Sequence, residues 1–309
     1  MGELPVIDFS DQHLKPGSPE WDSVRTRVQQ ALEEYGCFEA SYEKSSSELR
    51  KAEFEGLNLF ELPLETKMKN VSDNPSHAYI APHANALLYE SIGIEDPNVA
   101  QNVESLPNSF WPHGNTNFMS HFITPSVFLV HFCENFDVNF RDILQQKHGM
   151  DGGANARGRS NGNEDGIGEF WAMKYKAPNT SEKKLQSRDH TDKNIVTVLC
   201  QGIQGLEIQL KNGEWVAAKP HSSTVFFGDS VHAWLNGRLQ PPYHRVMMKG
   251  KEARYSFGLF PNPKKGYLIK APQELVEACK YAVFLRQISG HSLALEISWS
   301  LVSQDTTTI

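Results

Sequence analysis

The sequence lacks the features that mark membrane, secreted and nucleic-acid-binding proteins. Its four cysteines are widely spaced and form no Cys-x-x-Cys pair, which argues against structural zinc and a disulfide framework. It has neither an apolar run of about 18 residues nor a basic N-terminal segment followed by an apolar one. Lys and Arg total 30 against 37 Asp and Glu, with no basic block. These absences predict a cytoplasmic protein that binds neither membrane nor nucleic acid.

Strand signals dominate the second half of the chain. They recur at the roughly 8- to 12-residue spacing typical of sandwiches and barrels. Two Asn-Gly pairs, at 212–213 and 236–237, indicate hairpin turns. The pattern predicts a mainly β fold with flanking helices (α+β) and a double-stranded β-helix core, a jelly roll of the cupin type. The expected strands are 170–175, 195–200, 206–210, 214–218, 224–227, 231–235, 244–248 and 254–260.

The first hundred or so residues show helix and strand signals in turn. Ser18 is placed to cap a helix over 19–35, in which apolar residues recur at helical spacing before Gly36 ends it. Several prolines between 73 and 112 indicate a long loop. The other expected elements are strands over 5–9 and 37–40 and helices over 47–60 and 273–285.

The middle of the chain divides into two unlike parts. Residues 128–144 are apolar enough for a helix, whereas 151–168 are rich in glycine and almost free of apolar residues. We interpret the second part as a flexible insertion, or as sequence altered by a shifted reading frame or a retained intron. The chain is therefore expected to comprise an N-terminal region (1–112), an atypical connector (113–169), a jelly-roll core (170–277) and an atypical tail (278–309).

Two histidines and an aspartate in the expected core have the spacing of metal ligands. His190 and Asp192 are two residues apart, so their side chains point to the same face of an extended chain. His244 follows much later and can return on another strand. Two His and one carboxylate are the facial ligand set of non-haem Fe(II), which leaves positions open for a co-substrate and O₂. The alternative is a surface salt bridge between His190 and Asp192, with His244 a polar core residue.

Arg254 and Ser256 form a second pair at strand spacing, shortly after His244. The guanidinium of Arg254 offers a planar two-pronged donor, and Ser256 adds a hydroxyl. The pair is suited to the far carboxylate of an organic acid bound beside the metal.

This ordered set of five residues resembles that of the plant 2-oxoglutarate- and Fe(II)-dependent dioxygenases. The segments HTDKNIVTVLCQ, GDSVHAWLNGR, PPYHRVMMKGKEARYSFGLF and GYLIKAPQELV are most similar to the alkenyl- and hydroxyalkyl-producing (AOP-like) group. The resemblance covers roughly 1–111 and 171–277. It implies Fe(II), 2-oxoglutarate and O₂ as cofactors, with ascorbate as a supporting reductant. It also implies a monomer that oxidises a small specialised metabolite while 2-oxoglutarate becomes succinate and CO₂.

The resemblance adds three residues to the expected site and leaves two alternatives. It implies that Tyr175 also reaches the far carboxylate of 2-oxoglutarate, and that Tyr89 and Phe260 contact the substrate. The unusual middle and tail raise the alternative of a degenerate, non-catalytic homologue. A metal-binding cupin-type module or zinc hydrolase is the other alternative. The pair Arg254 and Ser256 argues against it, because a zinc hydrolase needs no acid-binding pair beside its metal.

Overall fold

The structure is a computed structural model. It describes residues 2–11, 18–41, 56–71, 78–82, 88–95, 108–111, 169–262, 268–271, 282–289 and 292–298, with the single positions 14, 113, 115 and 276. The helix expected over 128–144 and the glycine-rich segment 151–168 lie outside these residues. No helix in the described part of the chain is long and apolar enough to cross a membrane.

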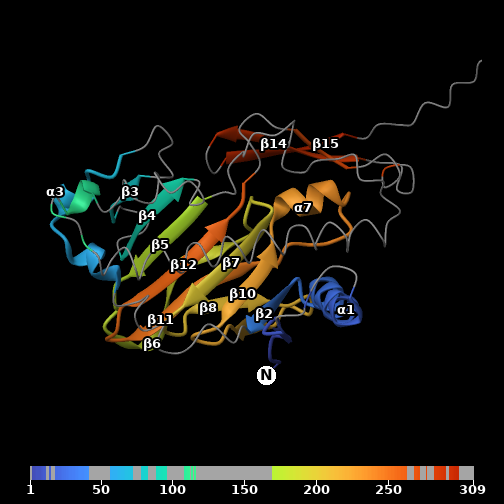
Figure 1. Cartoon of the computed structure of the whole chain (residues 1–309), viewed down its shortest axis with the longest axis horizontal. Helices are drawn as coiled ribbons and strands as arrows, with labels where there is room; N and C mark the ends of the chain where they lie inside the picture. The colour runs from blue at the N-terminus through green and yellow to red at the C-terminus, as the bar shows by residue number, and fades with distance from the viewer. Residues whose placement is uncertain are drawn as a thin grey trace, which may run out of the picture.

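Strands dominate the described ranges and form three sheets (Figure 1). The largest has the order β1-β2-β10-β7-β12-β5-β4-β3, the second β6-β11-β8-β9, and the third β13-β14-β15. The large sheet contains β1 (Val6–Asp8), β2 (Cys37–Ser41), β3 (Tyr79–Ile80), β4 (Tyr89–Glu95), β5 (Glu169–Tyr175), β7 (Val196–Gln201), β10 (Ser223–Phe227) and β12 (Arg254–Phe260). The second contains β6 (Thr180–His190), β8 (Leu206–Gln209), β9 (Trp215–Ala217) and β11 (His244–Gly250). The third contains β13 (Leu268–Lys270), β14 (Ala282–Ser289) and β15 (Ser292–Ser298).

The large and second sheets pack face to face, as the predicted jelly roll requires. Trp171, Leu199 and Phe226 of the large sheet share one apolar core with Ile208 and Val246 of the second sheet. Because side chains alternate along a strand, the other face of the large sheet forms a separate core. That core holds side chains such as Phe38, Phe170, Val198 and Phe257 together with apolar residues of the first helix. The mainly β fold is therefore confirmed, and the space between the sheets is where a pocket can form.

Helix α1 (Pro19–Glu34) forms as the sequence indicates and lies beside β2 (Figure 1). Ser18 caps it, since its hydroxyl accepts a hydrogen bond of 3.1 Å from the amide of Trp21. Gly36 follows the helix with a φ of +77°, a conformation that glycine adopts without a steric cost. The residues that this helix buries are the apolar ones at helical spacing: Trp21, Val24, Val28, Ala31 and Leu32.

The strand expected over 231–235 is wrong. Residues Asp229–Trp234 form helix α7, which packs against β13 and β14. Asn236 and Gly237 have φ values of +52° and +80°, and the amide of Gly237 donates to the carbonyl of His232 at 2.9 Å. The Asn-Gly pair therefore ends a helix here. Residues with a left-handed backbone conformation occur both in hairpin turns and at helix C-termini, so an Asn-Gly pair alone does not distinguish the two.

The loop expected over 73–112 is wrong in part. It contains β3 and β4, and β4 pairs along its length with β5. Ile92 and Ile94 alternate with Ser91 and Gly93, which is a strand signal that the surrounding prolines obscure. Tyr89 consequently lies on a strand of the large sheet.

Two expected helices also differ from the structure. The end of the helix expected over 47–60 is a 3₁₀ helix, η1 (Gly56–Glu61), and a short helix α3 (Leu64–Lys67) follows it. Residues 47–55 lie outside the described ranges. Of the helix expected over 273–285, residue 276 is helical, and residues 282–285 instead belong to β14, which pairs with both β13 and β15. The other positions lie outside the described ranges. Cross-strand pairing overrides the local helical pattern at this point.

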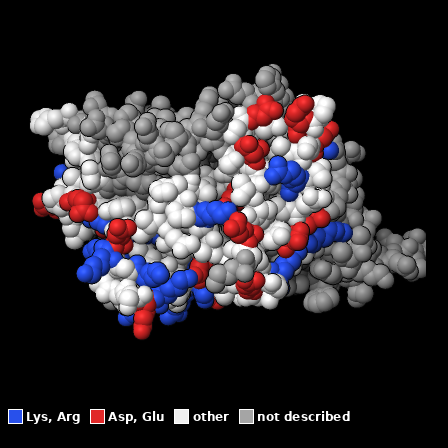
Figure 2. All heavy atoms as spheres, turned by 90° about the horizontal axis from the view of Figure 1, so that it is seen from below, with Lys and Arg blue, Asp and Glu red and all other residues white. Residues whose placement is uncertain are grey.

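Charges of both signs are interspersed on the face of the molecule shown in Figure 2, with Lys and Arg gathered toward one end. Part of this charge is neutralised locally in the second sheet. Glu207 of β8 forms ion pairs with Lys183 of β6, at 2.6 Å, and Arg245 of β11, at 2.9 Å. Arg245 also lies over the ring of Trp215 on β9, at 3.9 Å. These contacts link all four strands of the sheet that carries the two site histidines.

Candidate active site

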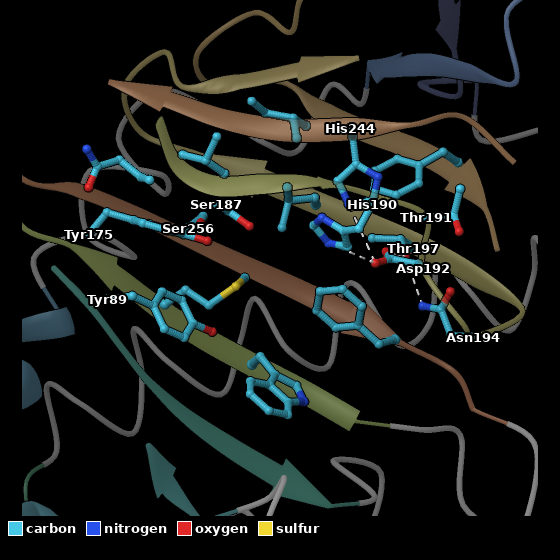
Figure 3. A pocket seen from close by; sticks show the side chains of 18 of the residues that line it. Tyr89, Tyr175, Ser187, His190, Thr191, Asp192, Asn194, Thr197, His244 and Ser256 are labelled. Atoms are coloured by element: carbon cyan, nitrogen blue, oxygen red, sulfur yellow. Dashed lines mark hydrogen bonds and ion pairs between the residues drawn. The ribbon is translucent and has the colours of Figure 1, made fainter. Parts of the chain in front are cut away.

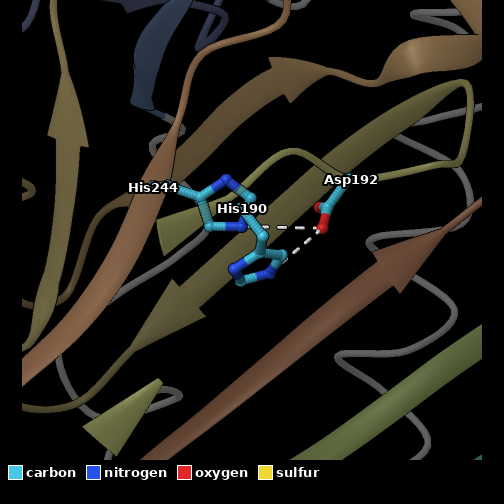
Figure 4. A group of neighbouring side chains, drawn as sticks. All are labelled: His190, Asp192 and His244. Atoms are coloured by element: carbon cyan, nitrogen blue, oxygen red, sulfur yellow. Dashed lines mark ion pairs between the residues drawn. The ribbon is translucent and has the colours of Figure 1, made fainter. Parts of the chain in front are cut away.

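The structure brings together His190, Asp192 and His244, the three side chains that the sequence predicts as metal ligands (Figure 4). His190 is the last residue of β6 and His244 the first of β11, and the two are directly paired across these strands. Asp192 lies just beyond the end of β6. The antiparallel pairing thus places residues far apart in the sequence at one end of the second sheet.

One oxygen of Asp192 faces both histidines. Its Oδ1 lies 3.7 Å from Nε2 of His190 and 3.5 Å from Nε2 of His244. The two imidazole rings have centroids 4.2 Å apart, and the ring of Phe226 packs against His244 at 4.7 Å. The side chain of His190 is 47% exposed, whereas those of Asp192 and His244 are 13% and 7% exposed. The cluster therefore opens to a pocket on the side of His190.

Backbone contacts define the tautomers of both histidines. Nδ1 of His190 lies 2.7 Å from the carbonyl of Arg188, and Nδ1 of His244 lies 3.4 Å from the carbonyl of Pro242. A carbonyl oxygen can only accept, so each Nδ1 carries a proton and each ring turns its Nε2 toward the cluster. Burial also lowers the pKa of His244, which keeps this imidazole neutral. Neutral rings with free Nε2 atoms are the form in which histidine binds metal ions.

The second oxygen of Asp192 is held by residues that lie outside the sequence motifs described above. The hydroxyl of Thr197, which is fully buried on β7, donates to Oδ2 of Asp192. Asn194 in turn donates from its amide to the hydroxyl of Thr197 at 2.9 Å and to the carbonyl of Val196 at 3.1 Å. Since Thr197 engages Oδ2, Oδ1 is left to face the histidines.

The three donor atoms fit a single divalent transition metal. They all lie within 4.8 Å of one another, and an ion bound at about 2.1 Å to each could bridge the measured 3.5 and 3.7 Å separations. No Lys or Arg is among the described contacts of the cluster, so a bound metal ion would offset the charge of Asp192. A two-histidine, one-carboxylate set with open positions is the arrangement typical of non-haem Fe(II).

The cluster lies in a cavity of about 540 Å³ between the two sheets (Figure 3). The triad lies toward one end, and Tyr89, Tyr175 and Ser256 lie toward the other. The cavity includes every residue that the sequence analysis assigned to the metal, the organic acid or the substrate. Those residues are Tyr89, Tyr175, His190, Asp192, His244, Arg254, Ser256 and Phe260.

Arg254 is a buried cation with neutral partners. It is 1% exposed, and its guanidinium donates to Oε1 of Gln201 from Nε at 3.1 Å and from Nη2 at 3.0 Å. Nη1 donates to the hydroxyl of Ser256 at 3.0 Å. No carboxylate among the described residues forms an ion pair with it, and burial lowers its pKa. An unpaired buried charge is costly, so this geometry favours an anionic ligand.

Two tyrosines flank this cation. Tyr89 of β4, Tyr175 of β5 and Arg254 of β12 are directly opposite one another on adjacent strands, so their side chains share one face. The tyrosine rings are 4.9 Å apart, and the guanidinium lies 5.1 Å from the ring of Tyr175. Burial raises the pKa of both phenols, which therefore stay protonated and able to donate to an anion.

The remaining wall of the cavity is largely apolar and includes Trp171, Met173 and Phe260. The ring of Phe260 lies over Gly258, where an added Cβ would come within 2.3 Å of it. Gly258 therefore allows the Phe260 ring to fold back against the sheet. This wall lies on the same strands, β5 and β12, as Tyr175 and Arg254.

Two family models match most of the described sequence. The model of the 2OG-Fe(II) oxygenase superfamily matches residues 169–263. The model described as the non-haem dioxygenase in morphine synthesis N-terminal region matches residues 4–112. The first match spans the second-sheet strands and β12, on which the candidate ligands lie.

Curated relatives and solved structures agree with these matches. A probable 2-oxoglutarate-dependent dioxygenase AOP1.2 of Arabidopsis thaliana is 44% identical over 289 residues, covering 89% of this chain and 85% of that protein. The dioxygenase for auxin oxidation of rice has a similar fold, with a TM-score of 0.69 at 24% identity, covering 88% of this chain and 87% of that one. The corresponding Arabidopsis thaliana enzyme, solved with 2-oxoglutarate, has a TM-score of 0.69 at 22% identity, covering 89% and 98%.

Proposed function

Because this chain belongs to the 2OG-Fe(II) oxygenase superfamily and is a 2-oxoglutarate-dependent dioxygenase that uses Fe(II), 2-oxoglutarate and O₂, we propose roles for the residues of its pocket. His190, Asp192 and His244 hold the iron. Arg254 and Ser256 hold the far carboxylate of 2-oxoglutarate. The observation that carries this assignment is the presence, in one cavity, of a cluster of two histidines and a carboxylate and of a buried arginine that has no anionic partner among the described residues.

The metal-binding residues act by orientation and charge. The two Nε2 atoms and Oδ1 of Asp192 would hold the ion at the wall of the cavity, and a set of two histidines and one carboxylate leaves coordination positions for other ligands. When bound, iron supplies the oxidising chemistry with O₂, while 2-oxoglutarate is converted into succinate and CO₂. The Nδ1 contacts to backbone carbonyls keep both imidazoles turned toward the ion.

The other end of the pocket selects the co-substrate. Arg254 gives the far carboxylate a charged, planar donor pair, and the hydroxyl of Ser256 adds a hydrogen bond. Tyr175 packs against the guanidinium and keeps a protonated phenol at the same end. These contacts are stronger in the buried pocket than in water. The guanidinium has lost its contact with solvent, and the carboxylate supplies the hydrogen-bond acceptors that water would otherwise provide.

The substrate is a small specialised metabolite that binds in the rest of the cavity. Tyr89 and Phe260, with the neighbouring Trp171 and Met173, offer it a mainly apolar surface with a phenol at one end. The reaction is oxidation of a C–H bond, as hydroxylation or a related outcome. The apolar wall excludes water and holds the reacting carbon beside the metal end of the cavity.

The wider organisation of the protein is also part of this proposal. The family matches over 4–112 and 169–263 support an N-terminal region (1–112) and a jelly-roll core (170–277), separated by the connector 113–169 and followed by the tail 278–309. Neither Cys37 nor Cys200, the two cysteines in the described part of the chain, forms a disulfide there, which supports a reducing compartment such as the cytoplasm. The protein acts there as a monomer.

The test is succinate formation from 2-oxoglutarate by purified protein with Fe(II), ascorbate and air. Wild type is expected to form succinate, and Asp192→Ala to lose this activity, because two neutral ligands alone hold Fe(II) weakly. Asp189→Ala is a matched control, since Asp189 is exposed and does not line the cavity. Equal succinate formation by wild type and Asp192→Ala would refute the assignment. The substrate is sought by adding plant metabolites one at a time. A substrate increases succinate formation and is itself converted into a product of different mass.

A further inference from the structure

Gln201 is a buried glutamine whose side chain is bonded at both ends. It is the last residue of β7 and is 1% exposed. Its Oε1 accepts from the guanidinium of Arg254 and from the amide of Leu206 at 3.1 Å. Its Nε2 donates to the carbonyl of Ala218 at 3.1 Å. These partners define the orientation of the amide. Reversing it would place its NH₂ group against the donors of Arg254 and Leu206, and its oxygen against the carbonyl of Ala218.

The contacts of Gln201 determine which donors of Arg254 remain free. A guanidinium has five N–H groups. Gln201 takes one from Nε and one from Nη2, and Ser256 takes one from Nη1. Among the described residues, one N–H on each terminal nitrogen has no partner, and these two donors are available to a carboxylate.

Packing against neighbouring residues also restricts the position of the guanidinium. Tyr175 lies against it at 5.1 Å, and a Cβ at Gly205 would come within 2.6 Å of Cδ and 2.8 Å of Nε of Arg254. The arginine thus passes over a position where only glycine fits. Rotation about the long axis of the side chain is then opposed by the two hydrogen bonds to Gln201 and the one to Ser256.

We propose that Gln201 is a positioning residue for 2-oxoglutarate: it aims the free fork of Arg254 without contacting the co-substrate and without neutralising the arginine. A neutral acceptor is required, since a carboxylate at the same place would pair with Arg254 and compete with 2-oxoglutarate. The inference rests on the proposed role of Arg254 in binding the far carboxylate. It concerns a residue outside the cavity wall, which acts through the arginine.

The test compares 2-oxoglutarate with 2-oxovalerate, an acid of the same length that has a methyl group in place of the far carboxylate. The dissociation constant of each is measured anaerobically on the Fe(II)-loaded full chain. Gln201→Leu is expected to weaken 2-oxoglutarate about 10- to 100-fold, the range for lost hydrogen bonds to a charged group, and to leave 2-oxovalerate unchanged. A merely structural role would weaken both acids equally, and this outcome would overturn the inference.

Two further variants keep the test decisive. Gln201→Glu retains the oxygen that accepts from Arg254 and Leu206 and loses the donor to the carbonyl of Ala218. It removes fewer contacts than the leucine variant and is expected to weaken 2-oxoglutarate at least tenfold, because the new carboxylate pairs with Arg254. Unchanged 2-oxoglutarate binding in a folded Gln201→Glu protein would also overturn the inference. Gln209→Leu, a glutamine on β8 that does not line the cavity, is the control expected to bind both acids like wild type.

Arg254→Leu separates this inference from the function on which it rests. It is expected to bind the two acids about equally. If Arg254→Leu loses the preference for 2-oxoglutarate while both Gln201 variants keep it, the role of Gln201 is wrong and that of Arg254 stands. If Arg254→Leu keeps the preference, the proposed binding of the far carboxylate is itself wrong.

Discussion

Asp192 presents one oxygen to two histidines because its other oxygen is already engaged. The hydroxyl of Thr197 holds Oδ2, and the amide of Asn194 holds that hydroxyl. Thr197 lies on β7 of the large sheet and Asn194 just before that strand, whereas the histidines come from the second sheet. Thr197 thus sets the direction from which the carboxylate meets the metal. Such outer contacts commonly change metal affinity by about 10- to 100-fold.

Thr197→Val keeps the shape of this side chain and removes its hydroxyl. We expect Fe(II) to bind about 10- to 100-fold more weakly, because Asp192 loses the contact that orients it. The affinity is measured anaerobically by competition with a coloured chelator. Thr224→Val on the neighbouring strand β10 is the matched control, since the buried hydroxyl of Thr224 has no hydrogen-bond partner among the described residues. Thr197→Val that binds Fe(II) as tightly as this control would contradict the role.

The candidate ligands could be read from the sequence because they occur at short, regular spacings. His190 with Asp192 and Arg254 with Ser256 lie two residues apart, and the structure places each pair in the cavity. Thr197 and Gln201 could not be assigned in this way, because their partners lie on other strands and depend on the register. One signal was present: both are polar residues on β7, a strand otherwise apolar and buried. Polar groups at such positions need partners.

At the scale of elements, β4 joins the pocket to a buried charge cluster on the opposite face of the large sheet. Tyr89 faces the cavity, and the next residue, Glu90, faces away from it. The carboxylate of Glu90 accepts from Lys67 and from the phenol of Tyr79, each at 2.6 Å. Lys67 also donates to the carbonyl of Phe60 at 2.9 Å. The cluster therefore ties α3 and η1 to β3 and β4, behind one wall of the pocket.

Lys67→Met leaves Glu90 buried without its main counter-charge. We expect the free energy of unfolding to fall by about 3–5 kcal/mol, the usual cost of removing one partner of a buried ion pair. Urea denaturation of the full chain measures this change. The double variant Lys67→Met/Glu90→Gln should recover part of the loss, since no unpaired charge remains.

An exposed lysine is the control for this prediction. Lys249 is exposed on β11 and forms no ion pair among the described residues, so Lys249→Met should unfold close to wild type. A Lys67→Met protein as stable as Lys249→Met would show that the cluster contributes little to stability.

Elements were predictable where local and tertiary signals agree. Helix α1 has a cap, a glycine stop and an apolar stripe that all indicate the same boundaries, and the structure confirms them. Residues 229–234 and 89–95 lacked such agreement. In the first, an Asn-Gly pair that fits either a hairpin or a helix end was assigned to a hairpin. In the second, prolines hid a strand whose existence depends on pairing with β5.

At the scale of the whole molecule, the site exists only where the two sheets meet. The histidines lie on β6 and β11 of the second sheet, whereas Arg254, Ser256 and Tyr175 lie on β12 and β5 of the large sheet. The jelly roll was predictable from the strand spacing, but the distance between these groups was not, because it depends on how the sheets pack. The buried Arg254 in the same cavity as the two histidines and Asp192 also argues against a zinc hydrolase and against a binding module that uses the metal alone.

The central claim is that iron and 2-oxoglutarate are held together in this one cavity. The most direct test is anaerobic addition of 2-oxoglutarate to Fe(II)-loaded full-length protein, while the visible charge-transfer band of a keto acid chelated to iron is monitored. We expect the band in wild type and its loss in His244→Ala. A soluble, folded, iron-loaded wild-type protein that gives no band would contradict the claim and favour a degenerate, non-catalytic homologue.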